Sequence, residues 1–155
     1  VSVASVRERL QAVEGLQDAS PRVRALVECL VLLWFDHLDA SHAISQAIDD
    51  PEGSYAHGMM HRREGDYWNS QYWMRRASAF EGWEALVEAM VDAWERAFPE
   101  RPTPIWLADG RLDGAGFVDA CEKAHKIGGE EALGIRALQQ AEFEAFLVWL
   151  GEPSR

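Results

Sequence analysis

Apolar residues recur at spacings of three and four along most of this chain, and that periodicity constrains its fold more than any other feature. Alternation of period two, the pattern of a half-buried strand, never extends beyond a few residues. Helical segments are predicted over residues 2–15, 20–49, 53–64, 66–77, 78–98, 112–129 and 130–151. The sequence therefore predicts an all-α bundle of about six or seven helices.

The ends of these segments carry ordinary helix signals. Ser20 is suited to cap a helix and Pro21 to occupy its first position. The apolar stripe that follows continues to Ile48, so one helix of about 42 Å is expected, ending before Pro51. By spacing alone, four of the seven tryptophans belong to the core: Trp34, Trp83, Trp94 and Trp149.

Length and composition indicate one folded domain, residues 1–155. The hydrophobic fraction is 48%, and the formal net charge is -11. That charge excludes nucleic acid and an anionic membrane surface as expected partners. No run reaches about 18 apolar residues, and the start lacks the layout of a signal peptide. Cys29 and Cys121 are predicted to be buried reduced thiols in a cytoplasmic protein. The many apolar helix faces are also compatible with a homodimer.

Residues 54–77 read as a helical hairpin with small residues where the helices must approach. The layout resembles one tetratricopeptide unit, with Gly58, Gly65, Tyr67, Ser70 and Ala77 in matching places. A second unit at a period of about 34 residues is not found. We therefore expect a single hairpin of this kind rather than a repeat array.

The hairpin's first helix carries a candidate metal site. His57, His61 and Glu64 stand at i, i+4 and i+7 and therefore project from one face. Neutral imidazoles at i and i+4 can share one metal ion, with Glu64 as a third ligand or an orienting group. The stretch reads His-Gly-Met-Met-His, which lacks the glutamate of the His-Glu-x-x-His zinc proteases. A zinc protease mechanism is therefore excluded.

The preceding helix offers partners for these histidines. If the chain turns at about Asp50, His42 stands level with His57, and Asp39 level with His61. Such a group would suit zinc, iron or manganese. In the alternative interpretation, Asp39 fixes one tautomer of His61 and no metal binds. His37 lies on the apolar stripe and is expected to be a hydrogen-bonded core histidine.

Arginines and aromatic rings surround the histidines. Arg75 and Arg76 should lie near acidic residues of the preceding turn (Asp49, Asp50 and Glu52), where ion pairs would account for them. The alternative is an anion pocket, since guanidinium groups suit carboxylate and phosphate. Amphipathic rings beside polar groups are typical of small-ligand sites and also of partner surfaces. The residues predicted to bind a ligand are Arg62, Arg63, Asn69, Tyr72, Trp73 and Arg76.

The segment 42–77 resembles a family of bacterial and fungal proteins that share the core His-Gly-x-x-His-Arg-Arg-Glu, here His57 to Glu64. In that family a Tyr-Trp pair and an Arg-Arg pair follow, as Tyr72–Trp73 and Arg75–Arg76 do in this chain. The family has no assigned activity, so the resemblance implies a shared site without naming its chemistry. Asp66 after the turn glycine is a variant of the pattern.

Three functions follow from these observations. The first is a soluble helical protein that binds a small molecule or a metal ion between the long helix and the 53–77 hairpin. The second is a protein interaction module in which the histidines are structural. The third is a metal-dependent enzyme whose arginines hold a small anionic substrate. Enclosure of the polar cluster would favour a ligand, and a flat exposed aromatic patch would favour a partner.

Overall fold

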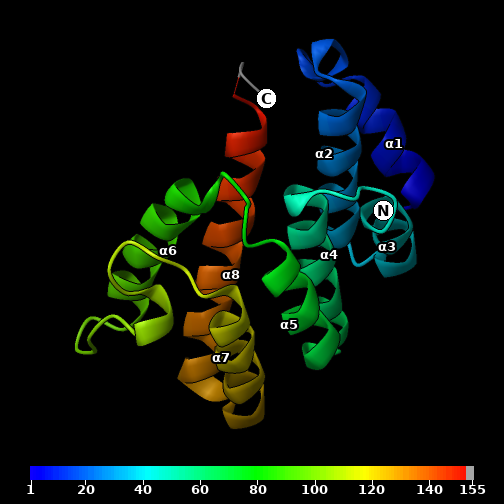
Figure 1. Cartoon of the computed structure of the whole chain (residues 1–155). Coiled ribbons are helices and arrows are strands. Elements are labelled where there is room, and N and C mark those ends of the chain that lie inside the picture. The colour runs from blue at the N-terminus through cyan, green and yellow to red at the C-terminus, as the bar shows by residue number, and fades with distance from the viewer. Residues whose placement is uncertain (153–155) are drawn as a thin grey trace.

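The computed structural model describes residues 1–152, and within that range every regular element is helical (Figure 1). Eight α-helices and two short 3-10 helices, Leu16–Asp18 and Ile105–Leu107, follow one another along the chain. The α-helices are α1 Val3–Gln11, α2 Pro21–Trp34, α3 Leu38–Ser45, α4 Pro51–Glu64, α5 Tyr67–Arg76, α6 Trp83–Ala97, α7 Gly114–Ile127 and α8 Gly129–Leu150. The all-α prediction is confirmed, with eight α-helices where about six or seven were expected.

The additional helix arises because the predicted long helix is interrupted. α2 begins as expected, with Ser20 Oγ accepting a hydrogen bond from the Val23 amide at 3.2 Å and Pro21 in the first turn. It ends at Trp34, and Asp36 adopts a positive φ of 60°. The His37 amide then bonds the Leu32 carbonyl at 2.9 Å, which closes the helix in the way a C-terminal glycine usually does.

His37 is consequently not the core histidine that the sequence predicted. It lies at the junction between α2 and α3, partly buried, and its Nε2 is 2.8 Å from the carbonyl oxygen of Val1. The apolar stripe gave no sign of this change in direction, because α2 and α3 each bury their own apolar face.

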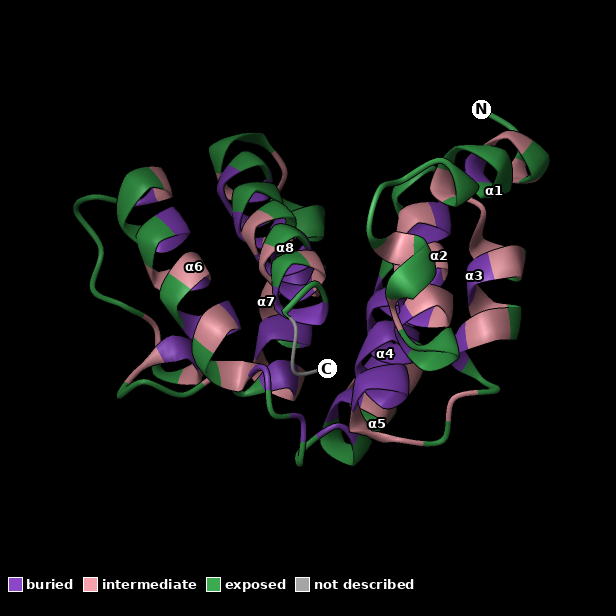
Figure 2. Cartoon of the chain, turned by 90° about the horizontal axis from the view of Figure 1, so that it is seen from above, coloured by how far each residue is buried: buried purple, intermediate pink, exposed green. Residues whose placement is uncertain are grey.

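The helices form two groups that meet along a shared core. In Figure 2, α6, α7 and α8 lie on one side and α1 to α5 on the other. α8 packs along α6 and also contacts α7 and α2, while α5 packs against α7. The larger of two hydrophobic clusters joins side chains of both groups, including Leu30 of α2, Tyr55 of α4 and Phe146 of α8. α4 is buried along nearly its whole length as a result (Figure 2).

Two of the four predicted core tryptophans are buried as expected. Trp94 and Trp149 lie in the core, and Trp83 is partly buried against it. The prediction that Trp34 belongs to the core is wrong. This residue, the last of α2, is 52% exposed. The helix ends there, so no further turn covers the ring.

The hairpin of α4 and α5 has the close approach that its small residues predicted. Ser70 Oγ donates to the carbonyl oxygen of Gly58 at 2.7 Å, and a Cβ at Gly58 would lie 3.0 Å from the Met74 methyl carbon. Gly65 ends α4 with a φ of 87°, a conformation that favours glycine. These contacts confirm the closely packed helical hairpin.

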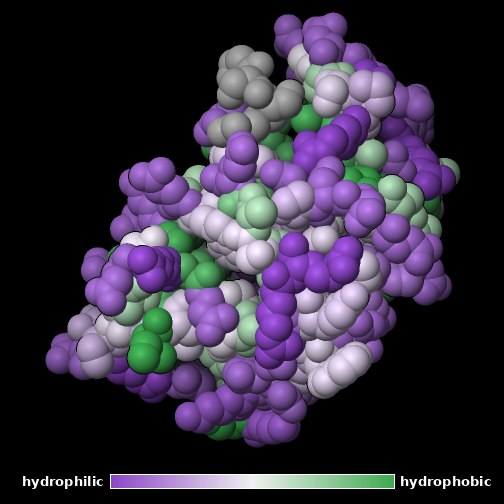
Figure 3. Space-filling model, in the orientation of Figure 1, coloured by the Kyte–Doolittle hydropathy of each residue, from purple (hydrophilic) through white to green (hydrophobic). Residues whose placement is uncertain are grey.

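The face of the molecule seen in Figure 3 is mainly hydrophilic. Hydrophilic side chains cover most of the face seen in Figure 3, and hydrophobic ones show only as small scattered patches. Cys29 and Cys121 are both buried and free, as predicted. Within residues 1–152, none of the helices combines the length and apolar character needed to cross a membrane.

Candidate metal centre

α4 carries two different sets of side chains on opposite faces. At 100° per residue, His57, His61 and Glu64 fall on one face, and Tyr55 and Arg62 fall about 130–150° away from its centre. The histidine face lies against α3 and α5, and the opposite face lies against α8. Both faces are buried, so each polar group on this helix needs a partner inside the molecule.

Three histidines meet on the first of these faces. The ring centroids are 4.7 Å apart between His42 and His57, 5.3 Å between His42 and His61, and 4.7 Å between His57 and His61. One ring nitrogen of each residue lies within 4.8 Å of a ring nitrogen of the other two. His57 and His61 are buried and His42 is partly buried. The sequence prediction that α3 supplies His42 to the two histidines of α4 agrees with this geometry.

His61 is held by hydrogen bonds on both ring nitrogens. Its Nδ1 lies 2.6 Å from Glu64 Oε1, and its Nε2 lies 3.1 Å from Asn69 Nδ2. An ionised carboxylate can only accept, so Nδ1 carries the proton and Nε2 accepts from the amide of Asn69. Glu64 therefore orients the ring in the way that carboxylates orient metal-bound histidines.

His57 has a different environment from His61. Within the described part of the chain, both Nδ1 and Nε2 are buried without a partner. The His57 ring stacks on the Trp73 ring, with centroids 3.9 Å apart, and on the His61 ring, with centroids 4.7 Å apart. Burial, with smaller contributions from His61 and His42, lowers the pKa of His57 to about 4. The imidazole is therefore neutral at physiological pH, which is the form that binds metal ions.

Other predicted residues complete the wall of this cluster. The guanidinium carbon of Arg76 lies 5.4 Å from the Trp73 ring and 5.9 Å from the Tyr72 ring. Arg76 also pairs with Asp49 at 3.5 Å, as one of the two interpretations expected. Asp50 and Glu52 pair instead with Arg22 of α2, each at 2.6 Å.

Some predicted site residues lie elsewhere. Asp39 is exposed on α3, and its carboxylate does not belong to the group of mutually close ligand atoms among residues 1–152. The level assigned to Asp39 was counted back from Asp50 along a continuous helix, but α3 ends at Ser45, so the residues between Ser45 and Asp50 do not follow the helical rise. Arg62 and Arg63 do not face the histidines: Arg62 contacts Glu142 of α8, and Arg63 pairs with Asp36 at 2.7 Å.

A second group of potential ligands shares His61. It consists of His61, Glu64 and Asp66, of which both carboxylates are exposed. Asp66 already accepts a hydrogen bond from the backbone N–H of Asn69 at 3.2 Å and thereby caps α5. We regard the three histidines as the stronger group, because exposed carboxylates are satisfied by water, whereas His57 is not.

The opposite face of α4 holds a buried network that the sequence analysis missed. Arg62 donates to both carboxylate oxygens of Glu142, one of them at 3.1 Å, and the Tyr55 hydroxyl donates to the same carboxylate. Burial alone would lower the pKa of Arg62, but the carboxylate outweighs it and raises the pKa. One sequence signal was present: Glu142 stands midway between Leu138 and Phe146, at i+4 and i−4, on the apolar face of α8.

Compared with known proteins, the chain matches no protein-family model, no curated protein and no solved structure. The motif resemblance of residues 42–77 therefore stays a prediction. The functional argument depends on the geometry of the site itself.

Proposed function

We propose that this protein binds one divalent transition-metal ion through His42, His57 and His61. The observation that carries the proposal is the buried His57 ring, whose two nitrogens have no hydrogen-bond partner within residues 1–152. A buried polar atom without a partner costs about 1–3 kcal/mol, and native proteins seldom retain one without a reason. A metal ion between the three rings would supply a partner for one of these two nitrogens.

The donor set suits a borderline metal. Three neutral imidazoles without a thiolate are typical of zinc and iron sites, and Glu64 would orient His61 from Nδ1 rather than bind the ion. A tetrahedral ion with metal–nitrogen bonds of 2.0–2.1 Å needs nitrogens about 3.3 Å apart. The present spacing of up to 4.8 Å means that the rings must draw together by side-chain rotation.

The chemistry of such a site would depend on its remaining coordination position. His42 is only partly buried, so this side of the group is the nearest to solvent. Three histidines with one open position are the arrangement in which zinc activates a bound water molecule. A hydrolytic activity is therefore a natural extension of metal binding, but Arg62 and Arg63 would not contact its substrate, because both lie on other sides of α4.

Metal content of untagged protein purified without chelator tests the proposal directly. Inductively coupled plasma mass spectrometry should find about one zinc, iron or manganese ion per chain, and the paired substitution His57→Ala with His61→Ala should remove it. His125→Ala is the matched control, because His125 is an exposed histidine in the last turn of α7. His42→Ala, at a partly buried position, repeats the test where folding is less at risk.

Zinc titration of the chelator-treated protein provides the second measurement. Calorimetry should show one site in the wild type and in His125→Ala, and a loss of at least about 100-fold in affinity in His42→Ala. Equal metal content in wild type and in a folded His42→Ala variant would overturn the proposal. Absence of stoichiometric binding by the wild type would also overturn it, and His57 would then be a purely structural residue.

A further inference from the structure

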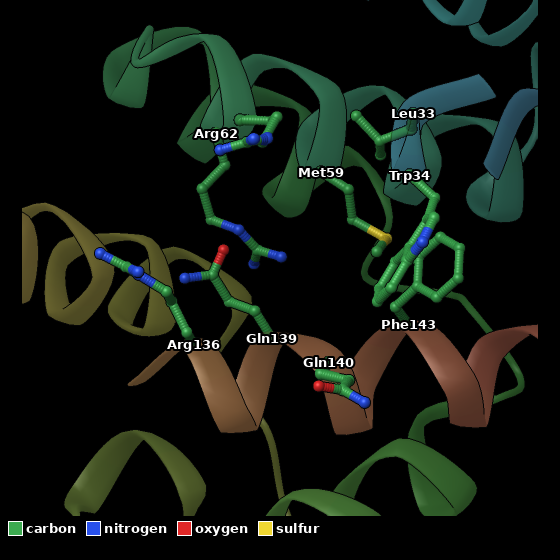
Figure 4. Close-up of a pocket in the computed structure, with 9 residues that line it drawn as sticks. Leu33, Trp34, Met59, Arg62, Arg136, Gln139, Gln140 and Phe143 are labelled. Carbon is green, nitrogen blue, oxygen red and sulfur yellow. The ribbon is translucent and has the colours of Figure 1, made fainter. Parts of the chain in front are cut away.

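A second site lies on the other face of α4, where a cleft separates α4 from α8. Two adjoining hollows, of about 340 and 560 Å³, share Arg62, Arg63, Arg136 and Gln139 in their walls. Figure 4 shows the first of them, with Arg62 reaching from α4 toward Gln139 on α8. Hollows of this size are typical of small-molecule sites.

The smaller hollow is lined by positive charge in a chain whose net charge is -11. Three arginines contribute to its wall, and no aspartate or glutamate among residues 1–152 does. Arg62 is neutralised by Glu142, and Arg63 is bonded to Asp36. Arg136 is different, because it is exposed and has no ion-pair partner in the described part of the chain. Its guanidinium group is therefore free to bind an anion.

The other end of the same hollow is aromatic. The Trp34 ring lies against the Phe143 ring with centroids 4.9 Å apart, and both rings line the hollow (Figure 4). Trp34 is 52% exposed as a residue, so its indole offers a flat surface on this apolar wall to an aromatic ring of a ligand. The apolar stripe predicted that Trp34 is buried. A ligand that covers the ring would account for an apolar side chain at this exposed position.

The two ends set the length of a ligand. Arg136 and Phe143 are seven residues apart on α8, a rise of about 10 Å along the helix axis. A small inorganic anion would reach the guanidinium group only, and a neutral aromatic compound would contact the rings only. An elongated molecule with a flat apolar body and a carboxylate at one end would contact both.

We propose that the cleft between α4 and α8 binds an elongated aromatic carboxylate. Its carboxylate is held by Arg136, with the Gln139 amide beside it, and its ring system lies against Trp34 and Phe143. Arg62 contributes N–H groups not used by Glu142: two of its five N–H donors are engaged there. The site is independent of the three histidines, which lie on the other face of α4.

Calorimetric titration with biphenyl-4-carboxylate, in a buffer containing chelator, tests this site separately from the metal centre. A ligand of about fifteen non-hydrogen atoms should bind with a Kd of about 0.5 mM or tighter. Biphenyl-4-carboxamide, which has the same shape and no charge, should bind about tenfold more weakly. The His42→Ala variant should bind the carboxylate as the wild type does.

Arg136→Gln should weaken carboxylate binding about tenfold and leave carboxamide binding unchanged, so that the two probes become equivalent. Arg9→Gln is the matched control, since Arg9 is an exposed arginine on α1, away from the cleft, and the charge change is the same. Trp34→Ala should weaken both probes about equally. Circular dichroism checks that each variant is folded.

Three outcomes would overturn the proposal. The first is the absence of saturable binding of the carboxylate by the folded wild type up to several times the expected Kd. The second is equal affinity of the wild type for carboxylate and carboxamide. The third is an equal effect of Arg136→Gln and Arg9→Gln, which would show that only overall charge matters.

Discussion

At the scale of single residues, His57 connects burial to pH. A free histidine has a pKa near 6.5, whereas burial lowers the pKa of His57 to about 4 in the folded protein. At a pH between these two pKa values, His57 is protonated in the unfolded chain and neutral in the folded chain. The unfolded state therefore binds more protons, so the free energy of unfolding must fall as the pH falls from about 6.5 toward 4.

We expect the metal-free wild type to lose about 1 kcal/mol more stability between pH 7 and pH 5 than His57→Leu does. This estimate is below the full value of the shift, because solvent near the partly buried His42 screens the group. Urea unfolding in chelator at the two pH values measures the difference between the two proteins. An identical pH dependence of both proteins would show that His57 titrates normally.

Asn69 is the residue that must give way if His61 binds metal through Nε2. Its side-chain amide lies 3.1 Å from that nitrogen, so the hydrogen bond competes with the metal. Loss of a competing hydrogen bond worth about 0.5–1.5 kcal/mol predicts that Asn69→Ala binds zinc about threefold to tenfold more tightly. Calorimetry of the chelator-treated variant measures this, and weaker binding would show that Asn69 orients the ring instead.

At the scale of elements, the break between α2 and α3 depends on Asp36. Its φ of 60° costs a residue with a side chain about 1 kcal/mol relative to glycine. Asp36→Gly and Asp36→Ala both remove the pair with Arg63, an exposed pair that contributes little. We therefore expect the glycine variant to be more stable than the alanine variant by about 1 kcal/mol in urea unfolding. Equal stabilities would mean that the turn relaxes.

Most elements could be predicted from periodicity, and the exceptions have physical causes. Pro51 marks the start of α4, because proline restricts the backbone of the residue before it. Gly65 marks the C-terminal end of α4, because glycine accepts a positive φ. The stretch Phe35–His37 contains neither residue type, so the sequence offered no local reason to stop the helix there. Backbone hydrogen bonds from Asp36 and His37 close α2, and such bonds leave no pattern in the apolar stripe.

The candidate site also has a part that could be predicted from the sequence and a part that could not. Helical spacing was sufficient to place His57 and His61 together, and a short connection from α3 to α4 was sufficient to bring His42 near them. Asp39 was misplaced, because its level was counted from Asp50 along a helix that in fact ends at Ser45. The cleft beside α8 was not predicted, since it forms between segments about 80 residues apart, Arg62 and Glu142 among them.

At the scale of the whole molecule, Arg62 and Glu142 join the two groups of helices. The pair links α4 to α8 inside the shared core, with the guanidinium group 4.9 Å from the Phe117 ring and the Tyr55 hydroxyl on the same carboxylate. Both partners are almost fully buried. An ion pair in this position restricts which faces of α4 and α8 can meet, because any other packing would bury an unpaired charge.

Removing one partner should therefore cost far more than replacing the whole network. Arg62→Met leaves the Glu142 carboxylate buried with Tyr55 alone, and we expect a loss of about 3–5 kcal/mol in the free energy of unfolding. The triple substitution Arg62→Met, Glu142→Leu and Tyr55→Phe removes every polar partner and should be more stable than Arg62→Met alone. Urea unfolding of the three proteins measures both differences. A triple variant less stable than the single one would show that the network stabilises the contact between the helix groups through more than its own pairing.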